Sequence, residues 1–280
     1  MSKEKKSPKN IKSIPSKITK KTHSSTVAIG DLHGEYKGFI EILRHTKLID
    51  KSLDWKAKNQ ILVQMGDVID RGEFGLEVYD LLEKMQCQSL KFKSKVIRLL
   101  GNHELEILKK HYYLTTMNAQ EIETIRKKLV CDVLNKKVIA GFYKDGYIFT
   151  HAGIRDELID VLFKGVPKKK LTLRALVKKL NDILYYAVLR SNFSNPIFNI
   201  SYRRGGSDKF GGIFWEDLRD FISCKHDYNF KQVVAHTPIE EVSVFADGKI
   251  TAIDVGIFKG YGGGKAYLNL KNKKVNIKKL

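Results

Sequence analysis

Two aspartates and an arginine occur between two glycines in the heptapeptide Gly-Asp-Val-Ile-Asp-Arg-Gly at residues 66–72. The heptapeptide follows an apolar run at residues 61–65, which predicts a buried strand that ends in a loop. Loops at the carboxyl ends of such strands carry much of the chemistry of α/β proteins. A cation beside Asp67 and a phosphate on Arg71 would offset the cost of packing these charges together. Taken alone, however, the stretch is better explained as a solvated, aspartate-rich turn.

Four other predicted strands end in residues of the same chemical kind. These residues are Asp31 with His33, Asn102 with His103, His151 and His236. One such residue at a strand end is usually structural, but desolvating five clusters of carboxylates and imidazoles requires a compensating charge. The mixed Asp, His and Asn donors suit Mn, Fe or Zn. The set lacks the thiolates of a structural zinc site and has too many imidazoles for Ca or Mg.

A strand–loop–helix pattern in the first half of the chain must position the first three clusters. Strands are predicted at residues 26–29, 61–65 and 96–100, with amphipathic helices after the first two and a helical region at residues 105–134. This order of elements predicts neighbouring parallel strands joined by crossover helices.

The second half of the chain changes from this pattern to strands that follow one another directly. A hairpin is predicted around Asp145-Gly146, with arms at residues 138–142 and 147–150. Residues 154–190 are expected to be helical, residues 191–212 to form a mobile loop over a site, and residues after 230 to be rich in strands. We therefore expect an α/β fold in which two mixed β-sheets pack as a sandwich flanked by helices.

The 280-residue chain carries a net charge of +20, and this charge is concentrated at its ends. Residues 1–23 contain eight lysines and one acidic residue, and residues 270–280 contain five lysines and no acidic residue. We expect residues 1–25 to form a disordered basic tail and residues 26–280 to form a single domain. The basic tails are expected to contact anionic partners, but the charge does not choose among nucleic acid, acidic membrane and phosphorylated protein.

The three cysteines, Cys87, Cys131 and Cys224, are far apart in the sequence and include no CxxC pair. This pattern predicts no disulfide framework and favours a cytoplasmic location. The sequence also contains no apolar run long enough to span a bilayer, so no transmembrane segment is expected.

Three ordered motifs resemble those of a known superfamily. They are Gly-Asp-Leu-His-Gly at residues 30–34, the heptapeptide at residues 66–72 and Gly-Asn-His-Glu at residues 101–104. Together with His151 and His236, they resemble the calcineurin-like metallophosphoesterases, and more closely the phosphoprotein phosphatase family and its diadenosine-tetraphosphatase relatives. The sequence His-Ala-Gly after the hairpin is similar to the bacterial-type branch. The resemblance covers about residues 26–270 and implies an α/β/β/α architecture.

The resemblance also implies a site with two divalent metal ions, manganese being expected and iron or zinc the alternatives. The implied metal ligands are Asp31, His33, Asp67, Asn102, His151 and His236. Asp67 would bridge the ions, and a hydroxide shared by them would attack phosphorus in line. The implied catalytic residues are His103 as general acid, Asp70 to orient it and Arg71 to bind phosphate, with Asn102 also at the phosphate. A second phosphate-binding arginine has two candidates, Arg204 and Arg219, and for each a solvated surface arginine is an equally good explanation.

These implications favour a phosphomonoester hydrolase, specifically a serine/threonine protein phosphatase acting on phosphoproteins. A dinucleoside polyphosphate hydrolase is the first alternative, because both substrates present a phosphate to the same metals. A non-enzymatic nucleic-acid- or anion-binding protein with a structural metal centre is the second, and the lysine-rich ends motivate it. A purely structural metal site would not need Asp70, Arg71 and His103 beside it.

Overall fold

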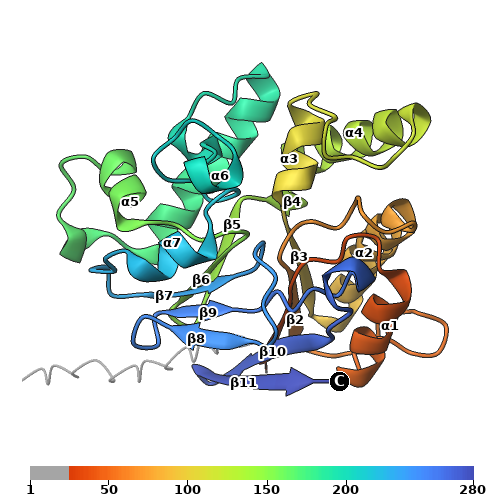
Figure 1. The fold of residues 1–280 in the computed structure, drawn as a ribbon. Helices are drawn as coiled ribbons and strands as arrows, with labels where there is room; N and C mark the ends of the chain where they lie inside the picture. Colours follow the sequence, from red (N-terminus) through yellow and green to blue (C-terminus); the bar gives the residue numbers. More distant parts are fainter. Residues whose placement is uncertain (1–24) are drawn as a thin grey trace, which may run out of the picture.

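The computed structural model describes residues 25–280, in which two β-sheets pack face to face with helices outside them (Figure 1). Apart from Ser25, which opens the first strand, the predicted basic tail lies outside the described residues. The strands of the first sheet, in spatial order, are β11 (Lys274–Lys279), β10 (Ala266–Lys271), β1 (Ser25–Ile29), β2 (Gln60–Gln64), β3 (Lys95–Leu99) and β4 (Val138–Ile139). Strands β1 to β4 are parallel, as the repeated strand–loop–helix pattern predicts.

The second sheet is also mixed. Its strands, in spatial order, are β5 (Gly141–Lys144), β6 (Tyr147–Thr150), β7 (Lys231–Val234), β9 (Ile250–Ala252) and β8 (Ser243–Phe245). The three inner strands run parallel, and the two outer strands are antiparallel to their neighbours. The predicted fold of two mixed sheets is therefore confirmed.

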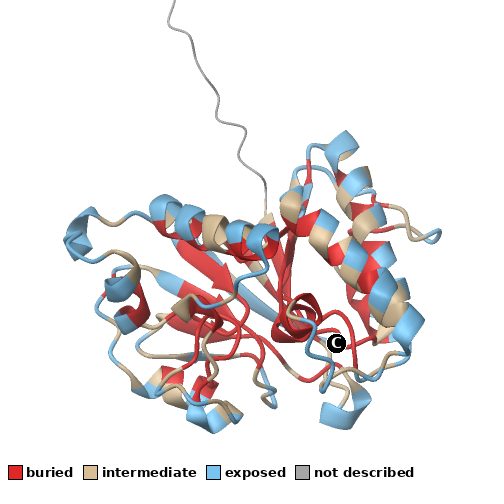
Figure 2. Ribbon diagram, turned by 90° about the horizontal axis from the view of Figure 1, so that it is seen from above, coloured by how far each residue is buried: buried red, intermediate tan, exposed pale blue. Residues whose placement is uncertain are grey.

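Alternating side chains of the inner strands explain the layers. In β1, Val27 packs toward the helices, whereas Ala28 packs between the two sheets together with Val63 from β2 and Phe149 from β6. Helices α1 (Tyr36–His45) and α2 (Gly75–Ser89) cover the outer face of the first sheet. Helix α7 (Leu218–Ser223) packs on the outer face of the second. Figure 2 shows buried strands in the interior and helices with one exposed face.

The two long helical regions predicted from the sequence are each interrupted. The first consists of α3 (Asn102–Leu108) and α4 (Ala119–Leu134), and the second of α5 (Asp156–Leu162) and α6 (Leu173–Arg190). Each second helix has its own side-chain cap, because Asn118 accepts hydrogen bonds at the start of α4 and Thr172 accepts one at the start of α6. Within residues 25–280, no helix is both long and apolar enough to cross a membrane.

The predicted hairpin arm at residues 138–142 is wrong as a single strand. Val138 and Ile139 pair with β3 in the first sheet, whereas residues from Gly141 onward pair with β6 in the second. Between them, the side-chain oxygen of Asn181 accepts hydrogen bonds from the backbone N–H groups of Ala140 and Gly141, both at 2.9 Å. The side chain thus replaces the ladder hydrogen bonds where the chain passes from one sheet to the other.

Residues 191–212 form an irregular segment that is partly packed into the core, and the mobility expected of it stays a prediction. Short 3₁₀ helices at Pro196–Phe198 and Tyr202–Arg204 place Ile197 and Phe198 in the core. At Gly206, Gly211 and Gly212 the neighbouring backbone leaves no room for a Cβ atom. A Cβ on Gly212 would lie 2.1 Å from the carbonyl oxygen of Ile197. This packing gives Arg204 a fixed position.

Candidate metal centre

The predicted site residues converge at the carboxyl ends of the strands from both sheets. They follow β1, β2, β3, β6 and β7, as the sequence predicts. The buried members are Asp31, His33, Asp67, Asp70, Asn102, His103, His151 and His236. A cluster of this many buried polar side chains is stable only if charges and hydrogen bonds compensate one another.

The first two motifs are joined by backbone hydrogen bonds. The N–H groups of Leu32 and His33 donate to the carbonyl of Asp67 at 2.8 and 2.9 Å, and the N–H of Gly72 donates to the carbonyl of His33 at 2.9 Å. A Cβ on Gly72 would lie 2.4 Å from that His33 oxygen, so only glycine permits this approach. Several site residues adopt a positive φ that is unusual for them, namely His33, Asp67, Asp70, Arg71 and His236. Such strained backbone is concentrated at functional sites.

Glu104 fixes the Asp67 loop, and the sequence analysis did not assign it a role. Its buried carboxylate accepts hydrogen bonds from the backbone N–H groups of Gly101 and Asp67, each at 2.9 Å, and of Val68 at 2.8 Å. The position of a glutamate three residues after Gly101 is a helix-capping pattern, which is the sequence signal that indicates this role.

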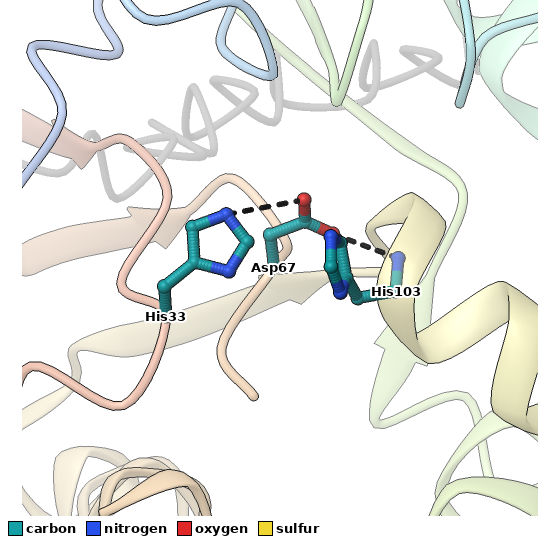
Figure 3. Close-up of side chains that lie close together, drawn as sticks. All are labelled: His33, Asp67 and His103. Atoms are coloured by element: carbon teal, nitrogen blue, oxygen red, sulfur yellow. Dashed lines mark hydrogen bonds and ion pairs between the residues drawn. The ribbon is translucent and has the colours of Figure 1, made fainter. Parts of the chain in front are cut away.

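The carboxylate of Asp67 occupies the centre of the cluster. Its Oδ1 accepts a hydrogen bond from the backbone N–H of His103 at 3.0 Å, and its Oδ2 lies 3.7 Å from Nε2 of His33 (Figure 3). On the other side, Nε2 of His151 lies 3.6 Å from the same Oδ2. One oxygen of Asp67 thus faces a histidine from each half of the site.

The second half of the site brings together donors from three strand ends. Nε2 of His151 lies 3.0 Å from Oδ1 of Asn102 and 3.2 Å from Nδ1 of His236. The side chains of Asp67, His151 and His236 form one group of potential ligands within 4.8 Å of one another, and His33, Asp67 and His103 form another. Nε2 of His236 is buried and has no hydrogen-bond partner among the described residues.

The hydrogen bonds of His33 and His151 suit these two rings to bind cations. Nδ1 of His33 lies 3.1 Å from the carbonyl of Ile69, and Nδ1 of His151 lies 2.9 Å from the carbonyl of Met65. Carbonyls only accept, so in both neutral rings Nε2 carries a lone pair. Burial lowers the pKa of His33 to about 4 and lowers the pKa of His151 as well. Lone pairs that face the Asp67 carboxylate and the Asn102 oxygen repel them unless a cation lies between.

Asp31 belongs to neither group of potential ligands, and its Oδ1 lies 3.7 Å from Nδ1 of His151. Its Oδ1 accepts a hydrogen bond from the backbone N–H of His236 at 3.3 Å. Burial raises the pKa of Asp31 well above its ordinary value, with the nearby charge of Asp254 adding to the effect. Asp254 was not among the predicted site residues, although it follows the end of strand β9 and the strand-end pattern therefore indicates it.

His103 differs from the other histidines of the site in its partners. Its Nδ1 lies 2.8 Å from Oδ2 of Asp70, and Oδ1 of Asp70 accepts a hydrogen bond from the hydroxyl of Thr115. Burial lowers the pKa of His103, but the charge of Asp67 and the hydrogen bond to Asp70 outweigh it, so the pKa is raised overall. Among these imidazoles, His103 is therefore the one suited to carry a proton.

The arginines differ in how they approach the site. Arg71 is exposed at the rim, directly after Asp70. Arg204 is 22 % exposed, contacts Thr237 beside His236, and places Nε 3.0 Å from Oδ2 of Asp217. Arg219 is 68 % exposed and pairs with the other oxygen of Asp217. Arg204, whose charge also acts on His151 and His236, is thus the better placed of the two candidates.

Comparison with protein families shows to which family the chain belongs. The model of the calcineurin-like phosphoesterase family matches residues 25–258. The chain belongs to this family. Members depend on a dinuclear metal centre, and the two ligand groups that share Asp67 agree with this requirement. The resemblance inferred from the three motifs is therefore confirmed.

Two curated relatives of this phosphoesterase carry names of protein phosphatases. The chain is 43 % identical to Shewanella-like protein phosphatase 1 of Plasmodium berghei, over 93 % of this chain and 75 % of the relative. It is 25 % identical to serine/threonine-protein phosphatase PP1-1 of Saccharomyces cerevisiae, over 46 % of this chain and 39 % of the relative. Among solved structures, a cold-active protein-tyrosine phosphatase of a psychrophilic Shewanella species is similar in fold, with a TM-score of 0.65 and 21 % identity. That match covers 92 % of this chain and 80 % of the solved one.

Proposed function

We propose that this phosphoesterase is a serine/threonine protein phosphatase that uses two divalent cations, with manganese preferred. The observation that carries the proposal is the position of Oδ2 of Asp67 between imidazoles of two ligand groups, with the Asp70-paired His103 beside it. The names of the Plasmodium and Saccharomyces relatives support phosphoproteins as the substrate. The proposal includes a cytoplasmic location, supported by three free cysteines, and a single domain at residues 26–280 that follows a basic tail.

The residues that would hold the metals fall into two sets that share Asp67. The first set is Asp31, His33 and Asp67, and the second is Asp67, Asn102, His151 and His236. When bound, the two cations would supply Lewis acidity toward the phosphoryl oxygens and lower the pKa of a water molecule. Glu104 keeps the Asp67 loop in place, and the carbonyls of Ile69 and Met65 orient the rings of His33 and His151.

His103 would hold the proton that the departing serine or threonine oxygen requires. Because Nδ1 donates to Asp70, the proton on Nε2 is the one directed away from the Asp70 carboxylate. Asp70 acts as a positioning residue, since it fixes the ring and favours the imidazolium form. Arg71 at the rim and Arg204 beside Thr237 would bind the oxygens of the phosphate from two sides.

An Arg204→Ala variant is expected to lower kcat/KM for a phosphoseryl peptide by roughly 10–100-fold, the scale of one lost charge-assisted contact in the transition state. Arg219→Ala is the matched control, because Arg219 pairs with the same Asp217 but is mostly exposed. Its kcat/KM is expected to stay within about threefold of the unmodified protein. Steady-state kinetics of both variants decide the matter. An equal or larger loss in the Arg219 variant would reverse the assignment.

Removal of metal is expected to abolish activity reversibly. Treatment with a chelator, followed by dialysis, should leave no hydrolysis of p-nitrophenyl phosphate, and added Mn²⁺ should restore it with two equivalents bound per chain. Elemental analysis gives the number of metal ions per chain, and the assay gives the activity before and after Mn²⁺ is added. Full activity in chelated, metal-free protein would exclude the proposed chemistry.

The two alternative functions are separated by substrate and by salt dependence. Turnover of a phosphoseryl peptide, a phosphotyrosyl peptide and diadenosine tetraphosphate should be measured side by side. We expect the phosphoseryl peptide to give the highest kcat/KM. A higher value for the dinucleotide would establish the first alternative. Salt-sensitive RNA binding that disappears on deletion of residues 1–24, without phosphatase activity, would establish the non-enzymatic one.

A further inference from the structure

A groove lies beside the rim arginine, Arg71, at the start of helix α1. Its volume is about 610 Å³, within the range of ligand sites. Three segments line it: residues 34–41 at the start of α1, residues 71–74 after the Asp70 turn, and residues 257–265 near the end of the chain. Because Arg71 belongs to both the groove and the site rim, a substrate whose phosphate contacts Arg71 can continue into the groove. We call it the aromatic groove, after Tyr36, Phe74 and Phe258, which line it.

The aromatic side chains are partly open to solvent and lie near the metal centre. Phe74 is 42 % exposed, and its ring centre lies 6.4 Å from that of Tyr36. The ring of Phe258 lies 5.4 Å from that of Tyr261, which in turn lies 5.7 Å from the imidazole of His33. A row of rings therefore leads from a proposed metal ligand into the groove. Exposed aromatic rings beside a site are a preferred place for partner side chains to bind.

The charges of the groove favour a neutral occupant. Glu41 pairs with Lys265, and the side chain of Glu35 accepts a hydrogen bond from the backbone N–H of Lys259. Apart from Arg71, the lining carries three acidic side chains, which are Glu35, Glu41 and Glu73, and three basic ones, which are Lys37, Lys259 and Lys265. The formal charges of these six residues cancel, so the polyphosphate chain of a dinucleotide would gain no net attraction there. The rings of Tyr36 and Phe74 are tilted by 47° and do not form the parallel-sided slot that holds a flat base.

We propose that the aromatic groove binds a bulky apolar side chain of the phosphoprotein substrate, located on one flank of the phosphorylated residue. This inference rests on the proposed function and adds a sequence preference to it. The groove is a single pocket beside Arg71 and the starts of α1 and α2. The preference is therefore confined to one side of the phosphoserine. The apolar side chain packs against Phe74 while the phosphate contacts Arg71.

The test uses the full chain with Mn²⁺ and a set of phosphoseryl peptides. Each peptide has alanine at the flanking positions except for one leucine, which is moved from position to position, and N-acetyl-phosphoserine amide serves as a substrate without flanks. We expect leucine on one flank to raise kcat/KM roughly 10-fold, the scale of one apolar side chain in a pocket. Phe74→Ala should remove this gain, and Phe74→Leu should retain most of it. The matched control is Tyr143→Ala, which removes a similarly exposed ring (39 %) from strand β5. It should leave the gain unchanged.

The outcomes separate this inference from the proposed function. Phosphoserine amide should be hydrolysed equally by all variants. Equal turnover of every peptide, or a gain that survives Phe74→Ala, would overturn the groove assignment while leaving the phosphatase intact. A Phe74→Ala loss confined to diadenosine tetraphosphate would show that the groove holds a nucleobase instead. A dimer that dissociates in Phe74→Ala would show that it holds a second copy. No turnover of phosphoserine amide by the unmodified chain would refute both proposals.

Discussion

An Asp67→Asn variant is expected to lose the binding of at least one metal ion and more than about 1,000-fold in kcat/KM. Removing a residue that only hydrogen-bonds to a metal ligand typically lowers metal affinity or activity roughly 10–100-fold. The effect should be larger for Asp67, because it is the one side chain common to both proposed ligand sets. The substitution is conservative, because an asparagine oxygen can still accept the hydrogen bond from the N–H of His103 that Oδ1 of Asp67 accepts at 3.0 Å.

Stability distinguishes loss of metal from loss of fold in this variant. In chelator Asp67→Asn should still unfold in one cooperative transition, with a modestly lower Tm, because, against the effect of burial, the neighbouring imidazoles hold the pKa of Asp67 below its ordinary value and so favour its charged form. Added Mn²⁺ should raise the Tm of the unmodified protein but not that of the variant. Asp247→Asn is the matched control, since Asp247 has the same φ of 51° in an exposed turn. Its metal response should be unchanged. A metal-dependent rise in the Tm of Asp67→Asn equal to that of the unmodified protein would contradict the assignment.

A His103→Asn variant is expected to bind both metals and to lose roughly 10²–10⁴-fold in kcat for a phosphoseryl peptide, the range of general acid catalysis. The loss should be smaller for p-nitrophenyl phosphate, whose leaving group departs without protonation. The raised pKa of His103 keeps its acid form present to higher pH than an ordinary histidine, and that form is lost as the pH rises through the pKa. The unmodified protein should therefore lose activity on the alkaline side, and the variant should lack this dependence.

Metal content and pH–rate profiles measured on the same preparation test the role of His103. His45→Asn serves as the control, because His45 lies on the exposed side of α1 and contacts Tyr267 instead of the site. The pH–rate profile of His45→Asn should match that of the unmodified protein. A His103→Asn variant that retains both metals and hydrolyses the phosphoseryl peptide at the unmodified rate would remove the acid role.

The strand-end clusters were predictable because a polar residue directly after a buried apolar strand lies at the edge of the sheet. Parallel strands bring their carboxyl ends to one edge, so Asp31, Asp67 and Asn102 had to meet. Asp254 follows the same rule, but it stands among antiparallel hairpin signals, where the sequence does not show that β9 pairs parallel with β7.

Contacts that depend on side-chain packing could not be predicted from the sequence. The separation of β4 from β5 depends on Asn181, which lies in helix α6 and accepts hydrogen bonds from the backbone N–H groups where the chain crosses between the sheets. The choice between Arg204 and Arg219 depends on how residues 191–212 pack, which their irregular sequence does not show. The helix interruptions, by contrast, were visible in the capping residues Asn118 and Thr172.

The proposed chemistry requires two cations that share the carboxylate of Asp67. Anomalous scattering from crystals of the Mn²⁺-loaded protein tests this requirement most directly. We predict two manganese peaks, one bounded by Asp31, His33 and Asp67 and the other by Asp67, Asn102, His151 and His236, with Asp67 bonded to both. A single peak, or a second peak that Asp67 does not contact, would contradict it.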